Sequence, residues 1–465
     1  MALQAPAADV GDSPKGPDKQ HAEAYRPQFH FTSKTGWLND PNGLVFLDGH
    51  WHLFFQHNPK GTKWGNMTWG HAVSTDLFHW EQWPNAIEPD GLGTVFSGSA
   101  VIDHDNTAGF GKDAMVAIYT AAGGENPESK GKPFTQCLAY STDGGRTMTK
   151  FAGNPILKNI SAGNRDPKIF WHAPTKKWVM ALWVEVNEDG RSVNTIQFFG
   201  SPNLKAWTYL SQITGFFECP DLFELAVDGD ATNTKWVIFG ADGNYVLGTF
   251  DGQIFTKETG KFRGDFGPNF YAAQTYSDVP KSDGRRILIG WMRGGRYPDM
   301  PFNQQMGIPT ELTLRKTPQG VQMFKWPARE IADLVTSEQD VPPGKIEGTR
   351  QLTTQPAELL DIEMEFDPGQ QGGLALNFRG LPVSWADGTL TVGKEAVDLR
   401  PVQGTVDLRM IVDRTSVEVF GNRGLVTVSH CFVPERGPEP LQMTTQGGGI
   451  GVVSMKVREL RSAWR

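Results

Sequence analysis

The sequence predicts an all-β protein with two domains, a β-propeller followed by a β-sandwich. Three observations favour this fold class: short strand-like runs bounded by turn residues, little helical periodicity, and a turn motif that recurs at regular intervals. With 465 residues, the chain is also too long for one ordinary domain, so one large and one smaller domain are expected.

The strand signals are runs rich in β-branched and aromatic residues. Each run is bounded by Gly, Pro, Asn or Asp, which punctuate strands because they suit turns. The clearest runs in the first 300 residues are Trp51–Phe55, Met115–Tyr119, Lys177–Trp183, Trp236–Phe239 and Arg286–Met292.

A weak internal repeat points to a propeller. A Ser-x-Asp/Asn turn begins at Ser74, Ser141 and Ser201, at intervals of about 60 to 70 residues. Such an interval suits one four-stranded blade with its loops, and repetition at this spacing is typical of radially stacked blades. The alternative is that three similar hairpin turns belong to a sandwich.

The texture of the sequence changes near Leu334. The following segment contains Glu, Asp and Pro-Pro-Gly and is typical of a linker, and the runs after it alternate as in a sandwich with one wet face. We therefore expect a flexible N-terminal segment at 1–24 and a propeller at 25–333. A linker at 334–345 and a sandwich at 346–465 should follow. The sandwich is interpreted mainly as a structural companion, with carbohydrate binding as the alternative.

Composition excludes some function classes. The net charge is −8, from 44 basic and 52 acidic residues, and no basic block stands out, which disfavours a nucleic-acid partner. No stretch approaches the length of a membrane span. Fifteen Trp residues suit the binding of an uncharged sugar, although Trp also fills β-sheet cores. Composition does not indicate an oligomeric state.

The N-terminus and the cysteines bear on location. Met1–Lys19 is polar and lacks the apolar region of an intact signal peptide, and it is similar to the start of a mature secreted protein. A secreted or periplasmic location is therefore expected, with cytoplasmic residence as the alternative. The three scattered cysteines form neither a disulfide framework nor a metal-binding pattern.

Three acidic residues stand in unusual surroundings. Asp40 lies in Asn-Asp-Pro-Asn-Gly, which is typical of a turn, and Asp166 lies in Arg-Asp-Pro-Lys, a short loop before a strand. Glu218 lies among Phe216, Phe217 and Cys219. Each acid taken alone has an ordinary structural explanation, because Asp-Pro turns are common.

Their environments suggest different chemical roles. Desolvation by apolar neighbours would help Glu218 to hold a proton near neutral pH, whereas turn amides would stabilise Asp40 as a carboxylate. A glycoside hydrolase needs one carboxyl of each kind. Asp166, beside Arg165, would be ionised and suited to holding sugar hydroxyls.

At this point the sequence resembles glycoside hydrolase family 32, the invertase, inulinase and levanase family. Any one of the shared motifs is weak, but they occur in the family's order over about residues 28–330. They are Trp37-Leu-Asn-Asp-Pro-Asn-Gly43, Phe55-Gln-His-Asn-Pro59, Trp64-Gly-Asn-Met-Thr-Trp-Gly-His71, Phe96-Ser-Gly-Ser-Ala100, Arg165-Asp-Pro-Lys168, Glu218-Cys-Pro-Asp-Leu-Phe223 and Phe270-Tyr-Ala-Ala-Gln-Thr275.

The resemblance implies a five-bladed propeller with a funnel-shaped active site, followed by a β-sandwich. It implies that Asp40 is the nucleophile, Asp166 the transition-state stabiliser and Glu218 the acid/base, and that no metal or organic cofactor takes part. The positions that match the terminal fructose pocket are Asn39, Gln56, Trp64, Phe96, Ser97 and Arg165, and Trp291 matches an aromatic near its rim.

The expected substrate is a fructan, and the expected activity is an exo-acting β-fructosidase that releases fructose from levan or inulin and acts less on sucrose. Asn269 departs from many microbial relatives, which have Asp there, and this puts contacts to the leaving sugar in doubt. The alternatives are an endo-acting levanase or inulinase, a fructosyltransferase, an arabinan-cleaving propeller enzyme and an inactive sugar-binding propeller.

Overall fold

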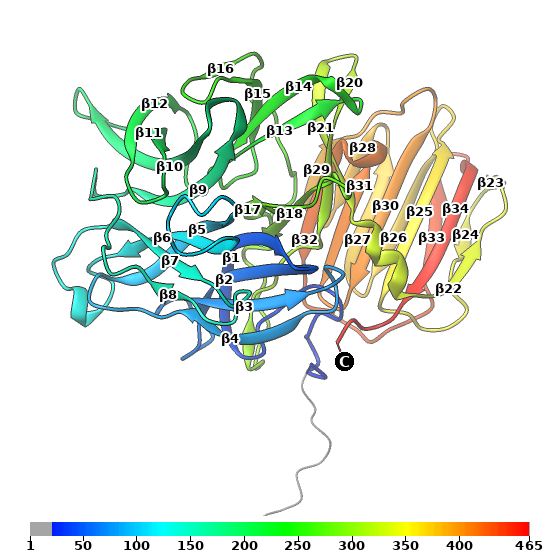
Figure 1. The fold of residues 1–465 in the computed structure, drawn as a ribbon. Coiled ribbons are helices and arrows are strands. Elements are labelled where there is room, and N and C mark those ends of the chain that lie inside the picture. The colour runs from blue at the N-terminus through cyan, green and yellow to red at the C-terminus, as the bar shows by residue number, and fades with distance from the viewer. Residues whose placement is uncertain (1–20, 465) are drawn as a thin grey trace, which may run out of the picture.

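A computed structural model describes residues 21–464, so the predicted flexible segment 1–24 lies mostly outside the described residues. Strands dominate the described chain, which confirms the all-β prediction (Figure 1). Helix within 21–464 is limited to short 3-10 turns, and none is long and apolar enough to cross a membrane. These turns are η1 (Pro127–Ser129), η2 (Ala173–Thr175), η3 (Arg329–Leu334) and η4 (Asn422–Gly424).

The N-terminal part of the described chain is built from antiparallel sheets that follow one another in sequence. The first contains β1 (Gly36–Leu47), β2 (His50–Asn58), β3 (Thr68–Ser74) and β4 (Glu81–Ile87), with β19 (Phe302–Asn303) parallel to β1. The second contains β5 (Thr94–Asp103), β6 (Ala114–Ala122), β7 (Thr135–Ser141) and β8 (Thr149–Lys150). The third contains β9 (Arg165–His172), β10 (Lys177–Glu188), β11 (Arg191–Ser201) and β12 (Thr208–Thr214).

The next sheet is larger because two antiparallel groups join through one parallel pair, between β13 and β20. The first group is β13 (Asp221–Val227), β14 (Asp230–Phe239), β15 (Tyr245–Phe250) and β16 (Phe255–Lys257). The second group is β17 (Tyr271–Thr275), β18 (Arg286–Trp291), β20 (Thr310–Thr317) and β21 (Gly320–Pro327). The five strand runs predicted from the first 300 residues lie in β2, β6, β10, β14 and β18.

Hydrophobic side chains fill the spaces between successive strand groups. Phe54 of β2 and Tyr119 of β6 belong to one buried cluster, and Ile118 and Met180 belong to the next. The series returns to its start, because Trp51 of β2 and Tyr276, just beyond β17, share a cluster and pack edge to face at 4.9 Å. Each group of strands therefore buries a face against its neighbours.

The repeated sequence motif forms the same turn in three sheets. The serines at 74, 141 and 201 end β3, β7 and β11, and each turn leads to the last strand of its sheet. In the first turn, Ser74 Oγ donates to Asp76 Oδ1 at 3.0 Å, and this oxygen also accepts from the backbone of Phe78 and His79. Asp143 and Asn203 make similar contacts. The repeat therefore marks equivalent positions in repeated sheets.

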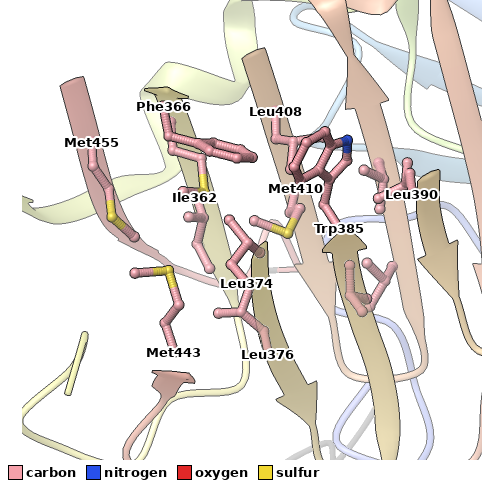
Figure 2. Packing of buried hydrophobic residues seen from close by; sticks show 14 of the residues in the cluster. Ile362, Phe366, Leu374, Leu376, Trp385, Leu390, Leu408, Met410, Met443 and Met455 are labelled. Carbon is pink, nitrogen blue, oxygen red and sulfur yellow. The ribbon is translucent and has the colours of Figure 1, made fainter. Parts of the chain in front are cut away.

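The C-terminal part consists of two facing antiparallel sheets (Figure 1). One contains β22 (Val335–Asp340), β23 (Gly344–Ile346), β25 (Leu360–Asp367), β30 (Val406–Asp413), β31 (Ser416–Gly421), β32 (Val426–Cys431) and β34 (Ile450–Leu460). The other contains β24 (Thr349–Gln351), β26 (Gly373–Phe378), β27 (Leu381–Ala386), β28 (Thr389–Val392), β29 (Glu395–Asp398) and β33 (Gln442–Gln446). Figure 2 shows side chains from both sheets, including Phe366 and Trp385, meeting in a shared core. The two rings pack edge to face at 5.4 Å.

Part of the segment predicted as a linker, 334–345, belongs to the two facing C-terminal sheets. Its residues Val335–Asp340 form β22, which pairs with β34, so the linker expectation is wrong for these residues. The polar and Pro-rich composition reflects an exposed edge strand rather than a free connection, since all but the first of its residues are exposed. The first and last parts of the described chain are also joined, because Ala463 N donates to Gln28 O at 2.8 Å.

Candidate active site

The three predicted acids come together although they are far apart in sequence. Asp40 lies on β1, Asp166 is the second residue of β9, and Glu218 lies in the loop before β13. Cys219 lies among them, with its Sγ 3.6 Å from Asp40 Oδ2 and 3.4 Å from Asp166 Oδ2. The N-terminal parts of β1 and β9, and the loop before β13, thus bring the three acids together.

The local backbone at the acids is irregular. The segment around Asp40 was predicted as a turn, but it runs within β1 as a bulged strand, with register shifts after Leu38 and after Asn42. Asp166, Glu218 and Cys219 have φ of 64°, 49° and 40°, in the left-handed region that costs energy for residues with a Cβ. Bulges and strained residues of this kind redirect side chains, and they cluster at functional sites.

The carboxyl of Asp40 is held by two side-chain donors. Ser97 Oγ donates to Asp40 Oδ2 at 2.6 Å, and Asn39 Nδ2 donates to Asp40 Oδ1 at 3.1 Å. Burial raises the pKa of Asp40 above its ordinary value, these two hydrogen bonds oppose the rise, and the charge of Glu218 adds to it. The donors therefore stabilise the carboxylate where burial alone would favour a proton.

Asp166 is buried and accepts a hydrogen bond from the backbone N–H of Cys219 at 3.1 Å. Burial raises its pKa to about 7, against the effect of Arg165, and the charges of Glu218 and Asp40 raise it further. The expectation that Arg165 keeps Asp166 fully ionised is therefore wrong. Burial outweighs the charge of Arg165, whose Nε is 3.9 Å from Asp166 Oδ2 and donates to Glu218 Oε1.

Glu218 is surrounded by polar partners, contrary to the apolar setting that the sequence suggested. Arg165 Nε donates to its Oε1 at 3.1 Å, and the Tyr271 hydroxyl donates to its Oε2 at 2.9 Å. Phe216 is buried, but Phe217 is 46% exposed and so does not shield the carboxyl. Arg165 is itself braced by Trp183, whose ring centroid lies 4.1 Å from the guanidinium carbon.

Cys219 and Tyr271 are functional-site residues that the sequence reasoning did not assign. Burial raises the pKa of the Cys219 thiol well above its ordinary value, and the nearby carboxylates raise it further, so the thiol stays protonated. It can then donate to Asp40 and Asp166, with which it is in contact. Both residues stand in the shared motifs, directly after Glu218 and Phe270, and this position was the available signal.

The remaining predicted residues surround these acids. Asn39 also accepts from Trp37 Nε1 at 2.8 Å, and buried Gln56 donates to Val95 O at 3.0 Å, two residues before Ser97. The Trp64 ring is 52% exposed and packs edge to face with Phe96 at 6.0 Å.

Trp291 contacts this group through Trp37 and Tyr271. It packs edge to face against both Trp37 and Tyr271 at 6.2 Å, and its Nε1 donates to Gln304 Oε1 at 3.1 Å. Its ring is nearly buried, whereas that of Trp64 is half exposed.

Both ends of the Asn269 side-chain amide are hydrogen-bonded to the backbone. Its Nδ2 donates to Arg293 O at 2.6 Å, and its Oδ1 accepts from Cys431 N at 2.8 Å, so the amide joins the segment after β18 to β32. The exposed side chain near this position is that of Arg293, whose guanidinium carbon lies 4.5 Å from the centre of the Tyr271 ring. A carboxylate at 269 could not donate to Arg293 O, so the amide of Asn269 has a structural role.

Within residues 21–464, no three His, Cys, Asp or Glu side chains are grouped so as to hold a metal ion.

Comparison with known proteins gives consistent matches over most of the chain. Residues 30–327 match the glycosyl hydrolases family 32 N-terminal domain, and residues 383–459 match the family 32 C-terminal domain. A levanase of Bacillus subtilis is 37% identical, over 98% of this chain and 73% of the relative. An extracellular exo-inulinase of Aspergillus ficuum is 31% identical, over 95% of this chain and 96% of the relative.

Solved structures of similar fold include an exo-inulinase and a fructofuranosidase. The crystal structure of exo-inulinase from Aspergillus awamori aligns with a TM-score of 0.83 at 30% identity, covering 96% of this chain and 100% of that chain. A fructofuranosidase from Schwanniomyces occidentalis, in complex with fructosylnystose, aligns with a TM-score of 0.83 at 28% identity, covering 95% and 99%.

Proposed function

The chain belongs to glycosyl hydrolase family 32, and from this premise we propose which of its residues carry out the reaction and on which substrates. It is a retaining glycoside hydrolase that cleaves fructosyl linkages in fructans or sucrose through a covalent fructosyl-enzyme intermediate. We assign Asp40 as the nucleophile, Glu218 as the acid/base and Asp166 as the stabiliser of the transition state.

In the first step, an Asp40 oxygen attacks the anomeric carbon of the fructosyl unit while Glu218 gives a proton to the leaving oxygen. The hydrogen bonds from Ser97 and Asn39 support this role, because they stabilise the ionised form of Asp40 against the effect of burial. Arg165 and Tyr271 hold Glu218 by both oxygens, which fixes its direction and stabilises the carboxylate left after proton transfer.

In the second step, Glu218 takes a proton from a water molecule as the water oxygen attacks the anomeric carbon. The bond to Asp40 breaks, and fructose is released. The ion pair with Arg165 suits Glu218 as a base at this stage. Asp166 remains beside the sugar, where its charge or its hydrogen bonding favours the oxocarbenium-like transition state. Burial and the charges of Glu218 and Asp40 raise the pKa of Asp166 to about 7, which lets it hold a proton near neutral pH.

We infer that Asn39, Gln56, Trp64, Phe96, Ser97 and Arg165 form the pocket for the terminal fructose, with Trp291 at its rim. Their placement around the acids supports this assignment. Exo attack on levan or inulin, with sucrose as the lesser substrate, is favoured by the similarity to an exo-inulinase and a levanase.

The fold around this site is proposed to be a five-bladed propeller at 25–333 and a β-sandwich at 346–465. In support, the hydrophobic clusters between successive strand groups run in series and return to the first sheet. Secretion is proposed because relatives such as the Aspergillus ficuum exo-inulinase are named extracellular.

Chromatography of the products from levan, inulin, sucrose and arabinan tests the substrate proposal. Free fructose should appear from the first minutes as the main product of levan or inulin. Early di- and trisaccharides would indicate endo attack, longer fructosylated products would indicate transfer, and cleavage of arabinan alone would refute the fructan assignment. Calorimetry that detects fructan binding without any turnover would identify an inactive binding protein.

A further inference from the structure

A second cavity lies at the opposite end of the inner strands from the acids. Strand β9 begins at Arg165, beside Glu218, and ends at His172, which lines a cavity of about 530 Å³. Strand β5 runs in the same sense, from Phe96 and Ser97 near the acids toward Asp103 at the cavity. At about 3.3 Å per residue, the six residues from Asp166 to Trp171 place the cavity roughly 15–20 Å from the acids.

Rigid aromatic rings form part of its wall. Trp171 is 37% exposed and packs edge to face with buried Trp178 at 5.1 Å. Trp178 is fixed by a hydrogen bond from its Nε1 to Thr107 Oγ1 at 2.8 Å. Across the cavity, half-buried Trp236 packs against Phe250 at 5.3 Å. Exposed indole faces on a fixed support are suited to the apolar face of a sugar ring.

Several charged groups of the cavity are paired within the protein, whereas the exposed carboxyls of Asp105 and Glu224 face solvent. Lys168 Nζ lies 3.2 Å from Asp221 Oδ2 and donates to Thr275 O at 2.7 Å. Asp278 accepts from Ile102 N at 2.8 Å and lies 3.6 Å from His104 Nε2.

Arg286 donates to Tyr276 O at 3.0 Å, and the negative charges of Asp221 and Asp278 act on it. Exposed Glu224 adds a further acceptor to the lining. Donors and acceptors of both kinds beside aromatic rings suit a neutral ligand that carries many hydroxyls.

We propose that this cavity is a second carbohydrate site, which binds a segment of a fructan chain at the opposite end of the strands from the acids. The proposal rests on the fructan hydrolase function, because only a polymeric substrate can occupy the acids and a distant second site together. A chain bound there stays near the enzyme, so the local concentration of its free ends at the acids rises. Sucrose is too short to use both places.

The test compares Trp171→Ala with Tyr209→Ala, an exposed aromatic outside the cavity that packs edge to face with Phe199 at 5.8 Å. Kinetics on levan, inulin and sucrose are measured for both, and levan affinity is measured by gel retardation. Trp171→Ala should raise the KM for a polymeric fructan roughly threefold to tenfold, as expected for one lost ring contact, and leave sucrose kinetics unchanged. Trp171→Phe should retain most of the affinity.

Three outcomes would overturn the second site. They are unchanged KM and retardation in Trp171→Ala, an equal loss in Tyr209→Ala, or an equal loss on sucrose, which would indicate structural damage. A failure of the hydrolase function is separate, because the unaltered protein would then release fructose from none of the three substrates.

Discussion

Two clusters of acidic residues in this molecule differ in how completely they are neutralised. At the active site, Arg165 lies near two of the three carboxyls and faces mainly Glu218, while Asp40 is held by Ser97 and Asn39. At the junction where residues 28–30 meet β30 and β31, His30 lies between Asp413 and Glu418. Its ring nitrogens lie 2.8 and 2.7 Å from the two carboxyls. Asp413 also accepts from the backbone of Gln28, Phe29 and His30.

The difference shows in the titration of each cluster. Burial alone would lower the pKa of His30, but the hydrogen bonds to Asp413 and Glu418 outweigh it and raise the pKa to about 9. Asp166, by contrast, has a pKa raised to about 7 because burial and its acidic neighbours prevail. We interpret the junction as built for stability and the active site as built for proton transfer, and four substitutions or conditions test this contrast.

The largest effect is expected for Asp40→Asn. Losing the attacking charge should reduce kcat by roughly 10⁴-fold or more, as for other covalent catalysts that lose the nucleophile. The melting temperature should stay the same or rise, because a charge leaves a crowded cluster. Asp189→Asn, the same change at an exposed position between β10 and β11, is the matched control for both measurements. A large fall in melting temperature would show that Asp40 stabilises the fold.

Glu218→Gln should act selectively. On sucrose or levan, whose leaving groups need a proton, the rate should fall by roughly 10²- to 10⁴-fold. On an activated fructoside with a good leaving group, formation of the intermediate should fall far less. Equal losses on both substrates, measured under single-turnover conditions, would remove the acid role from Glu218.

His30→Ala should destabilise the protein without changing its chemistry. The variant leaves Asp413 and Glu418 buried without their partner, which typically costs about 3–5 kcal/mol of the free energy of unfolding. Denaturant unfolding measures this cost, with exposed His50→Ala as the matched control. A fall in kcat on sucrose without a loss of stability would contradict the assignment of the His30 cluster to stability alone.

The stabilisation from His30 should depend on pH in a defined direction. Because the pKa in the folded state, about 9, lies above the ordinary value of 6.5, this contribution is full below pH 6.5 and is lost as pH rises through 9. The difference in unfolding free energy between the original protein and His30→Ala should therefore shrink between pH 6.5 and 9.5. A difference that is constant over this range would contradict a charged His30.

Much of the fold could be predicted because it depends on local patterns. The predicted strand runs lie in strands, and the Ser-x-Asp/Asn repeat marks equivalent turns because its side chains bond to the adjacent backbone. The linker prediction is wrong for Val335–Asp340, since a polar composition does not distinguish an exposed edge strand from a free connection.

The acids themselves were recognisable from ordered motifs, but their environments depend on contacts from distant parts of the chain. Glu218 has apolar sequence neighbours, yet its bonding partners are Arg165 and Tyr271, each 53 residues away. Asn269 joins two backbone segments through Arg293 O and Cys431 N, and its sequence neighbours do not indicate this link. Long-range side-chain contacts of this kind leave no local pattern.

The most direct test of the account is to identify the residue that carries the covalent intermediate. Glu218→Gln, reacting with an activated fructoside, should accumulate the intermediate, because its formation needs little acid help and its hydrolysis lacks the base. Acid quenching, peptic digestion and mass spectrometry should then find one added fructosyl unit on Asp40. A fructosyl group on Asp166, or none on any acid while turnover continues, would contradict the assignment.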